Sequence, residues 1–92
     1  MTKPWYVYMV RCAKNALYTG ITQDVVNRVA QHNAGTGAKA VKALGLPVTL
    51  VYTETVDTKG AALKREYEIK QLPKSYKENM IKSPRNEINR PL

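Results

Sequence analysis

The pattern of apolar and polar positions predicts three β-strands. Residues 5–11 are rich in aromatic and β-branched side chains, which suit a half-buried strand, and residues 17–21 form a second such run. The residues between them, Ala13-Lys14-Asn15, suit a tight hairpin loop in which Asn15 readily adopts a positive φ. Alternating positions predict a third strand over residues 48–54. The three strands are expected to form a mainly antiparallel sheet.

Apolar residues at helical spacing account for most of the remaining chain. The predicted helices cover residues 24–33, 38–44, 59–72 and 75–82. Gly45 and Pro73 suit the ends of the second and third of these helices. The expected fold class is therefore α/β of the α+β type, a small three-stranded sheet flanked by helices. We expect one domain over residues 1–83 and a flexible polar tail with little to bury over residues 84–92.

The hairpin is expected to gather phenol side chains on one face of the sheet. With a three-residue loop, residues of equal parity face each other, so Tyr8 lies opposite Gly20 and diagonal to Tyr18, about 7 Å away. Tyr6 points to the same face. Gly20 has no side chain, so a ligand could approach the backbone there. The alternative for each tyrosine is a packing residue with a polar tip.

One acidic residue conflicts with the pattern of the long helix. The apolar arc of a helical wheel consists of Ala62, Leu63, Tyr67 and Ile69. Glu66 falls inside this arc, whereas Glu68 and Arg65 fall on the far side. A carboxylate that faces a core is costly unless it is paired, hydrogen-bonded or bound to a metal. Glu66 is therefore a candidate functional acid, and its alternative is an ion pair with Arg28 or Lys70.

The charge of the chain indicates a polyanionic partner. Fifteen Lys and Arg against seven Asp and Glu give a net charge of +8. Nucleic acid is the first candidate partner, an anionic membrane surface is the second, and a basic protein without such a partner is the remaining alternative. The predicted helices lack the large apolar face that a membrane surface requires, so we expect no membrane association.

Cysteine content and hydropathy narrow the remaining possibilities. Cys12 is the only cysteine, which excludes an intramolecular disulfide and a cysteine metal cluster. No apolar run approaches a membrane span or a signal-peptide core, so a cytoplasmic location is expected. Gly35-Thr36-Gly37 lacks the lysine and the spacing of a phosphate-binding loop. Lys39 and Lys42 follow these glycines and could track a phosphate backbone, or they could simply be solvated.

Several of these residues together resemble the signature of the GIY-YIG nuclease family. Val7-Tyr8 followed by Tyr18-Thr19-Gly20 resembles the paired motif of the family, although Tyr6 stands where the family name has glycine. The polar positions of the family are matched by Tyr8, Tyr18, Arg28, His32 and Glu66. The resemblance covers about residues 5–81 and is greatest to small, stand-alone bacterial members.

The resemblance implies a metal-dependent endonuclease that hydrolyses phosphodiester bonds in nucleic acid, with DNA favoured over RNA. Glu66 would bind Mg²⁺ or Mn²⁺, and Arg28 would hold the scissile phosphate bidentately. Tyr18 would accept the proton of the attacking water with support from Tyr8, and His32 would orient a tyrosine hydroxyl or relay its proton. The candidate nucleic-acid-binding residues are Gly20, Lys39, Lys42 and Lys70.

A nucleic-acid-binding module on the same scaffold, inactive alone, is the alternative function, because a fold does not guarantee an activity. The nuclease is favoured because competent residues occupy all five polar positions of the family. A degenerate binder would be free to lose Glu66 from an apolar face. Members of this family usually take their target choice from an added domain, so a protein partner for targeting is also expected.

Overall fold

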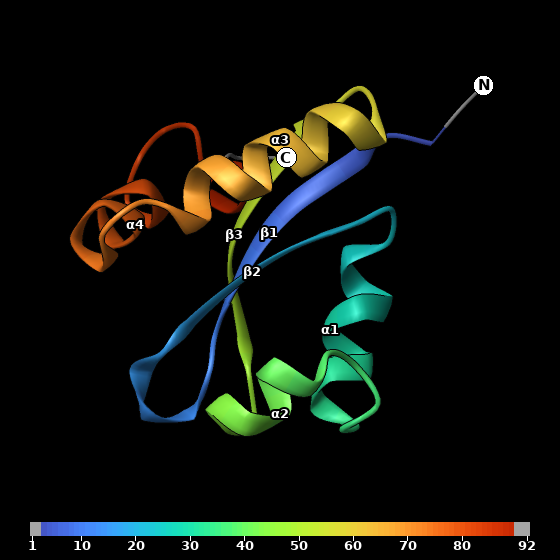
Figure 1. Cartoon of the computed structure of the whole chain (residues 1–92), viewed down its shortest axis with the longest axis vertical. Coiled ribbons are helices and arrows are strands. Elements are labelled where there is room, and N and C mark those ends of the chain that lie inside the picture. Colours follow the sequence, from blue (N-terminus) through green and yellow to red (C-terminus); the bar gives the residue numbers. More distant parts are fainter. Residues whose placement is uncertain (1–2, 90–92) are drawn as a thin grey trace.

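A three-stranded sheet with four α-helices makes up residues 3–89, which are the residues that this computed structural model describes (Figure 1). The strands are β1 (Trp5–Arg11), β2 (Leu17–Thr22) and β3 (Thr49–Val56). The helices are α1 (Val25–Asn33), α2 (Lys39–Leu44), α3 (Lys59–Lys70) and α4 (Lys74–Ile81), and short 3₁₀ turns lie at Ala13–Asn15 and Glu87–Asn89. The predicted fold class is confirmed. No helix within residues 3–89 is long and apolar enough to cross a membrane.

The strand order is β2-β1-β3, and both pairs are antiparallel. Tyr8 pairs with Gly20 and Val10 pairs with Tyr18, so the register predicted for the hairpin is confirmed. The hairpin loop also has the predicted backbone: Asn15 has a φ of 67°, and Lys14 shares this left-handed conformation. A shift of register against β3 between Met9 and Val10 bends the sheet locally.

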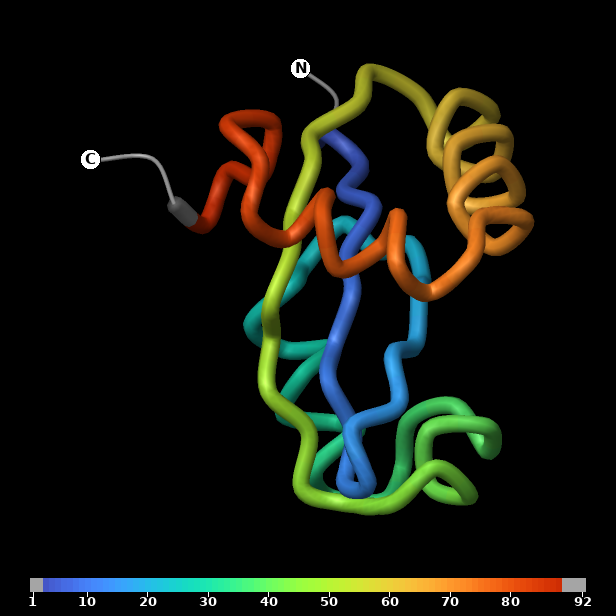
Figure 2. Tube along the Cα trace, turned by 90° about the vertical axis from the view of Figure 1, so that its left-hand side faces the viewer, coloured from blue at the N-terminus to red at the C-terminus, as the bar shows by residue number. Residues whose placement is uncertain are grey.

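Helices cover both faces of the sheet, and each face has its own core. Figure 2 shows α4 in front of the sheet and α1 behind it, with α3 beside the β2 edge. The core beneath α3 and α4 contains Val7, Met9, Tyr52, Ala62 and Ile69. The core beneath α1 and α2 contains Tyr8, Val10, Cys12, Val41 and Val48. Successive residues of β1 alternate between the two cores, as the pleat of a strand requires.

The inward face of α3 differs from the predicted arc. Leu63 and Tyr67 were expected to pack but are 47 % and 68 % exposed. The inward stripe is Ala62, Arg65, Glu66 and Ile69. Arg65 turns inward because its guanidinium finds a partner on β3: its Nε donates to both carboxylate oxygens of Glu54, at 3.1 and 3.0 Å. The prediction was right for Glu66 and wrong for Leu63, Tyr67 and Arg65.

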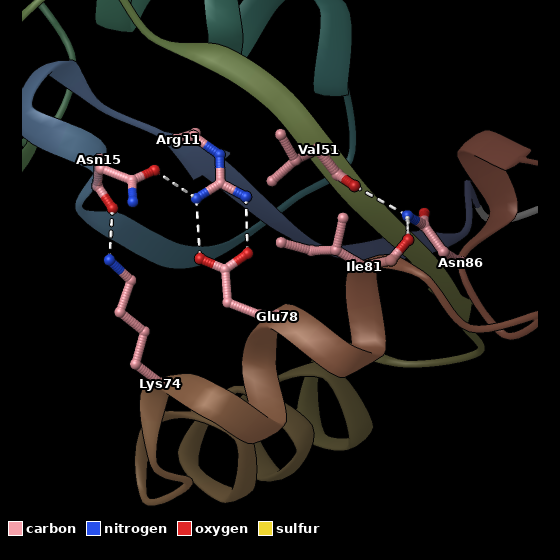
Figure 3. A network of polar contacts seen from close by, with 7 residues as sticks. All are labelled: Arg11, Asn15, Val51, Lys74, Glu78, Ile81 and Asn86. Carbon is pink, nitrogen blue, oxygen red and sulfur yellow. Dashed lines mark hydrogen bonds and ion pairs between the residues drawn. The ribbon is translucent and has the colours of Figure 1, made fainter.

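Side chains from α4 hold it against the hairpin. Figure 3 shows the Arg11 guanidinium donating to both carboxylate oxygens of Glu78, at 2.8 and 2.7 Å, while its Nη1 also donates to the Asn15 side chain. Lys74 donates to the Asn15 carbonyl oxygen at 2.7 Å. Partly exposed pairs of this kind stabilise little, but the two-point geometry fixes the orientation of the helix.

The segment after α4 closes the free edge of β3. Asn86 is completely buried, and its amide nitrogen donates to the carbonyl oxygens of Val51 and Ile81, both at 2.8 Å (Figure 3). Its amide oxygen accepts from the Thr53 backbone nitrogen. The prediction that this stretch has little to bury is therefore wrong at Asn86, because a side-chain amide replaces the missing neighbour strand. Residues 90–92 of the predicted tail lie outside the described residues.

Candidate active site

Tyr8, from β1, and His32, from α1, form a buried hydrogen-bonded pair. The Tyr8 hydroxyl lies 2.8 Å from His32 Nε2, and both side chains are only 1 % exposed. The start of helix α1 is fixed by a cap. The Asp24 carboxylate accepts a hydrogen bond from the Asn27 backbone nitrogen and caps the helix. His32 lies eight residues after this cap, about two turns along α1, where its imidazole reaches Tyr8.

Glycines on two sides allow this close packing. A Cβ built on Gly20 would lie 2.6 Å from the Tyr8 hydroxyl oxygen, so the phenol occupies the space that a side chain would need. A Cβ built on Gly37 would collide with His32 Nδ1. The open backbone patch predicted at Gly20 is therefore wrong, because Tyr8 itself covers that glycine. The role of Gly37 was not predicted from the sequence.

Tyr18 completes a group of three rings. Its ring centroid lies 6.5 Å from that of Tyr8 and 5.7 Å from that of His32. Tyr18 is half-buried at the β2 edge, where α3 passes. The predicted diagonal placement of the two tyrosines is confirmed by the strand register.

Helix α3 brings an ion pair to the edge of this ring group. Glu66 Oε2 lies 3.4 Å from Lys70 Nζ, one turn along the helix. The Glu66 side chain is 20 % exposed, so it faces inward and keeps a route to solvent. Lys70 Nζ also lies 5.9 Å from the centre of the Tyr18 ring. Of the two partners considered for Glu66, Lys70 is the one that the structure pairs with it.

Electrostatics connects the remaining candidates to Tyr8. Burial raises the pKa of Tyr8 to about 12, and negative charge on Tyr18 acts in the same direction. The half-buried Arg28 guanidinium opposes this shift, whereas the Glu66 carboxylate adds to it. Both charges therefore lie close enough to act on the Tyr8 hydroxyl. We call Tyr8, Tyr18, Arg28, His32 and Glu66 the site cluster.

His32 is held neutral inside the site cluster. Burial lowers the pKa of its imidazole, and the positive charge of Arg28 lowers it further. His32 Nδ1 is buried without a hydrogen-bond partner among the described residues. A neutral imidazole can either accept the Tyr8 hydroxyl proton at Nε2 or donate to the phenol oxygen.

A metal ion would find one carboxylate in the site cluster. No group of three or more His, Cys, Asp or Glu side chains able to hold a metal occurs within residues 3–89. Glu66 fits the requirement of Mg²⁺ for a hard oxygen ligand, since this ion usually keeps several waters and binds through one or two carboxylates and substrate phosphates. Lys70 contacts only the Oε2 oxygen of this carboxylate, at 3.4 Å.

The predicted nucleic-acid contacts are placed at different parts of the molecule. Lys70 belongs to the edge of the site cluster. Lys39 and Lys42 are exposed on α2, whose Val41 packs into the same core as Tyr8. Gly20 is buried and covered by Tyr8, so its backbone is not an accessible contact.

Known proteins share both the sequence and the fold. The GIY-YIG catalytic domain model matches residues 4–79. A UPF0213 protein of Vibrio cholerae is 56 % identical over 82 residues, 88 % of this chain and 80 % of that protein. The UPF0213 protein YhbQ of Salmonella typhimurium is 50 % identical over 78 residues, 85 % of this chain and 77 % of that protein.

Two solution NMR structures show the same architecture. The UPF0213 protein BH0048 of Bacillus halodurans superposes with a TM-score of 0.57 at 34 % identity, covering 92 % of this chain and 89 % of that one. The protein EF2693 of E. faecalis gives a TM-score of 0.60 at 35 % identity, covering 88 % and 85 %. Sequence and structure agree that the chain belongs to the GIY-YIG family of nucleases, among relatives that carry the UPF0213 name.

Proposed function

We propose that this protein is a metal-dependent endonuclease that hydrolyses phosphodiester bonds, with DNA favoured over RNA as its substrate. The observation that carries the proposal is the ring group of Tyr8, Tyr18 and His32 with an ion pair at its edge. Lys70, which is paired with Glu66 on α3, lies 5.9 Å from the centre of the Tyr18 ring. An acid, a guanidinium and phenols within one cluster can supply a metal ligand, charge stabilisation at the phosphate and a proton acceptor, which together support phosphodiester hydrolysis.

Each residue of the site cluster has a defined task in this proposal. Arg28 binds the scissile phosphate through two parallel N–H donors and stabilises the negative charge that develops there. Glu66 would hold the metal ion, which when bound would supply a Lewis acid at the phosphate. Lys70, which lies beside Glu66, would offer a second cation for the substrate.

Tyr18 is our first choice for the base that accepts the proton of the attacking water. Tyr8 is less suited, because it is buried, its pKa is raised to about 12, and its hydroxyl is already bound to His32. Tyr18 is half-buried instead, and Lys70 lies beside its ring. Tyr8 and neutral His32 then hold the ring group in place and offer a route for the proton.

Removal of the carboxylate charge tests the proposal directly. Glu66→Gln should reduce Mg²⁺- or Mn²⁺-dependent cleavage by a factor of about a hundred or more, while the fold survives. The assay uses a panel of labelled DNA and RNA structures with Mg²⁺, Mn²⁺ or EDTA. The matched control is Glu68→Gln, an exposed acid on the same helix. Undiminished cleavage by Glu66→Gln would refute the assignment.

A nucleic-acid-binding module is the second candidate, and one observation favours it. Glu66 already has a counter-ion in Lys70, so its position in the fold does not demand a metal. This module would bind the same panel of substrates and cut none of them in either metal. Its binding would also be insensitive to EDTA, whereas a substrate-borne metal would strengthen binding to the nuclease.

A further inference from the structure

A hollow of about 350 Å³ lies on the face of the sheet that carries Tyr8. Its lining residues are Tyr6, Gln23, Asp24, Val25, Val26 and Thr53. Tyr6 precedes Tyr8 by two residues on β1, and Thr53 pairs with Tyr8 across β3, so both point to that face. The volume is at the lower end of the range of small-molecule sites, about 300–1,000 Å³.

The hollow and the site cluster are neighbours along two elements. On β1, Tyr6 and Tyr8 are about 7 Å apart, because a strand rises by roughly 3.4 Å per residue. Asp24, the N-cap of α1, lies one turn before Arg28, and the Arg28 backbone nitrogen donates to the Asp24 carbonyl oxygen at 3.0 Å. A nucleotide next to a phosphate held by Arg28 would therefore reach the hollow.

The lining of the hollow suits a base and not a phosphate. None of the six lining residues is Lys or Arg, and one of them is the acid Asp24. The Tyr6 ring, together with Val25 and the 83 % exposed Val26, offers an aromatic and apolar surface. Stacking on such a ring is the usual way in which proteins bind unpaired bases.

Two consecutive residues offer hydrogen-bond acceptors to the occupant. Asp24 Oδ1 accepts from the Asn27 backbone nitrogen, whereas Asp24 Oδ2 has no partner among residues 3–89. The Gln23 side-chain nitrogen donates to the Lys3 carbonyl oxygen. The side-chain oxygen of Gln23 is therefore left to accept a hydrogen bond from the occupant. Of the four bases, guanine presents two adjacent donors on one edge, N1–H and the 2-amino group.

From these observations we infer that the hollow is a nucleobase subsite, which takes an unpaired guanine next to the phosphate held by Arg28. This inference rests on the proposed function for the identity of the ligand, nucleic acid. The subsite would give the protein a preference for one base, whereas the contact proposed for Arg28 is to a phosphate only. Tyr6 stacks on the base, and Asp24 accepts from its Watson–Crick edge.

Loss of one amino group tests the contact with Asp24. Short labelled thymidine strands carry a single guanine or a single inosine, which lacks the 2-amino group, and they are titrated onto the Glu66→Gln protein in EDTA. The guanine strand should bind about fivefold more tightly, because the amino group donates to a carboxylate. Asp24→Ser, which keeps the helix cap, should abolish the difference. Asp57→Ser, an exposed acid elsewhere, should preserve it.

A second set of variants tests the stacking role of Tyr6. Tyr6→Leu should weaken the guanine strand by about fivefold or more, and Tyr6→Phe should keep most of the affinity because the ring remains. Tyr76→Leu is the matched control, since Tyr76 is 58 % exposed on α4. Thermal melting of each variant checks that the fold is retained.

The outcomes separate this inference from the proposed function. Equal binding of the guanine and inosine strands, or a difference that persists in Asp24→Ser, overturns the subsite, as does failure of every strand to bind. Cleavage by the wild-type protein without base discrimination then leaves the proposed function standing. Discrimination without cleavage in either metal overturns the nuclease and supports the subsite.

Discussion

Lys70 and Glu66 lie one turn apart on α3, and their ion pair sets the state of the candidate metal ligand. The pair is partly exposed, with 47 % of the lysine side chain open to solvent, so its own contribution to stability is small. In the proposed function a metal ion and the lysine would compete for this one carboxylate. Lys70 would then weaken metal binding to the free protein.

Substitution of Lys70 by methionine should strengthen metal binding to the protein without substrate. The dissociation constant for Mn²⁺ should fall by about twofold to fivefold, the effect of losing one partly exposed competing cation. Titration followed by electron paramagnetic resonance measures it directly. Lys64→Met, an exposed lysine on the same helix, serves as the comparison. An unchanged or higher dissociation constant in Lys70→Met would contradict the competition.

His32 gives the fold a dependence on pH that can be assigned to one group. The groups that face it are Tyr8, Tyr18 and Arg28. Because the folded pKa lies below the ordinary 6.5, the unfolded state takes up the proton first as the pH falls. The stability contributed by neutral His32 is thus present above pH 6.5 and is lost as the pH falls towards the folded pKa.

Thermal melting across pH 7 to about 5 should show this loss, because unfolded histidine titrates within that range. The melting temperature of the wild type should decrease on acidification. His32→Gln, which can still bond the Tyr8 hydroxyl, should decrease much less. The chain has a single histidine, so no other imidazole contributes. Parallel decreases in the two proteins would assign the effect to carboxylates instead.

At the scale of elements, local periodicity predicted the features that are set by residues close together in the sequence. The hairpin register followed from a three-residue loop and the two-residue period of strands, and it placed Tyr8 opposite Gly20 correctly. The inward side of α3 did not follow, because Arg65 is satisfied by Glu54 on β3, eleven residues away. A pairing of this kind leaves no trace in helical spacing.

The Asn86 amide shows the same limit and carries a prediction for the β3 edge. Asn86→Ala should destabilise the fold by about 2–4 kcal/mol, because it leaves the carbonyl oxygens of Val51 and Ile81 and the Thr53 N–H without their partner. Urea unfolding measures the loss. Asn79→Ala, an exposed asparagine on α4, should change stability by less than about 0.5 kcal/mol. A loss of less than about 0.5 kcal/mol in Asn86→Ala would show that its amide does not stabilise the β3 edge.

At the scale of the whole molecule, the proposed function assigns the long-range part of recognition to net charge and the local part to the site cluster. A charge of +8 on 92 residues attracts any polyanion, whether DNA or RNA. The sequence predicted this attraction from composition, and it predicted the members of the site cluster from a family resemblance. The ion pair of Glu66 with Lys70, the cover over Gly20 and the hollow beside Tyr6 required coordinates, since each joins residues from different elements.

The salt dependence of binding should reflect that division. For the Glu66→Gln protein in EDTA, the logarithm of affinity should fall with the logarithm of salt concentration at a slope of about −4, as expected when about four or five phosphates are neutralised. Fluorescence anisotropy over a series of salt concentrations gives the slope. Tyr6→Leu should lower the affinity without changing the slope. A slope near zero would mean that the excess charge does not contact phosphates.

The buried amide of Asn86 has a consequence for how the protein can be shortened. A chain that stops after Ser83 keeps every member of the site cluster but leaves the outer hydrogen-bonding groups of β3 without Asn86 and Glu87. Strand edges of this kind recruit other chains. Such a fragment would contain every residue of the site cluster, but it would self-associate, so its oligomeric state would depend on its concentration.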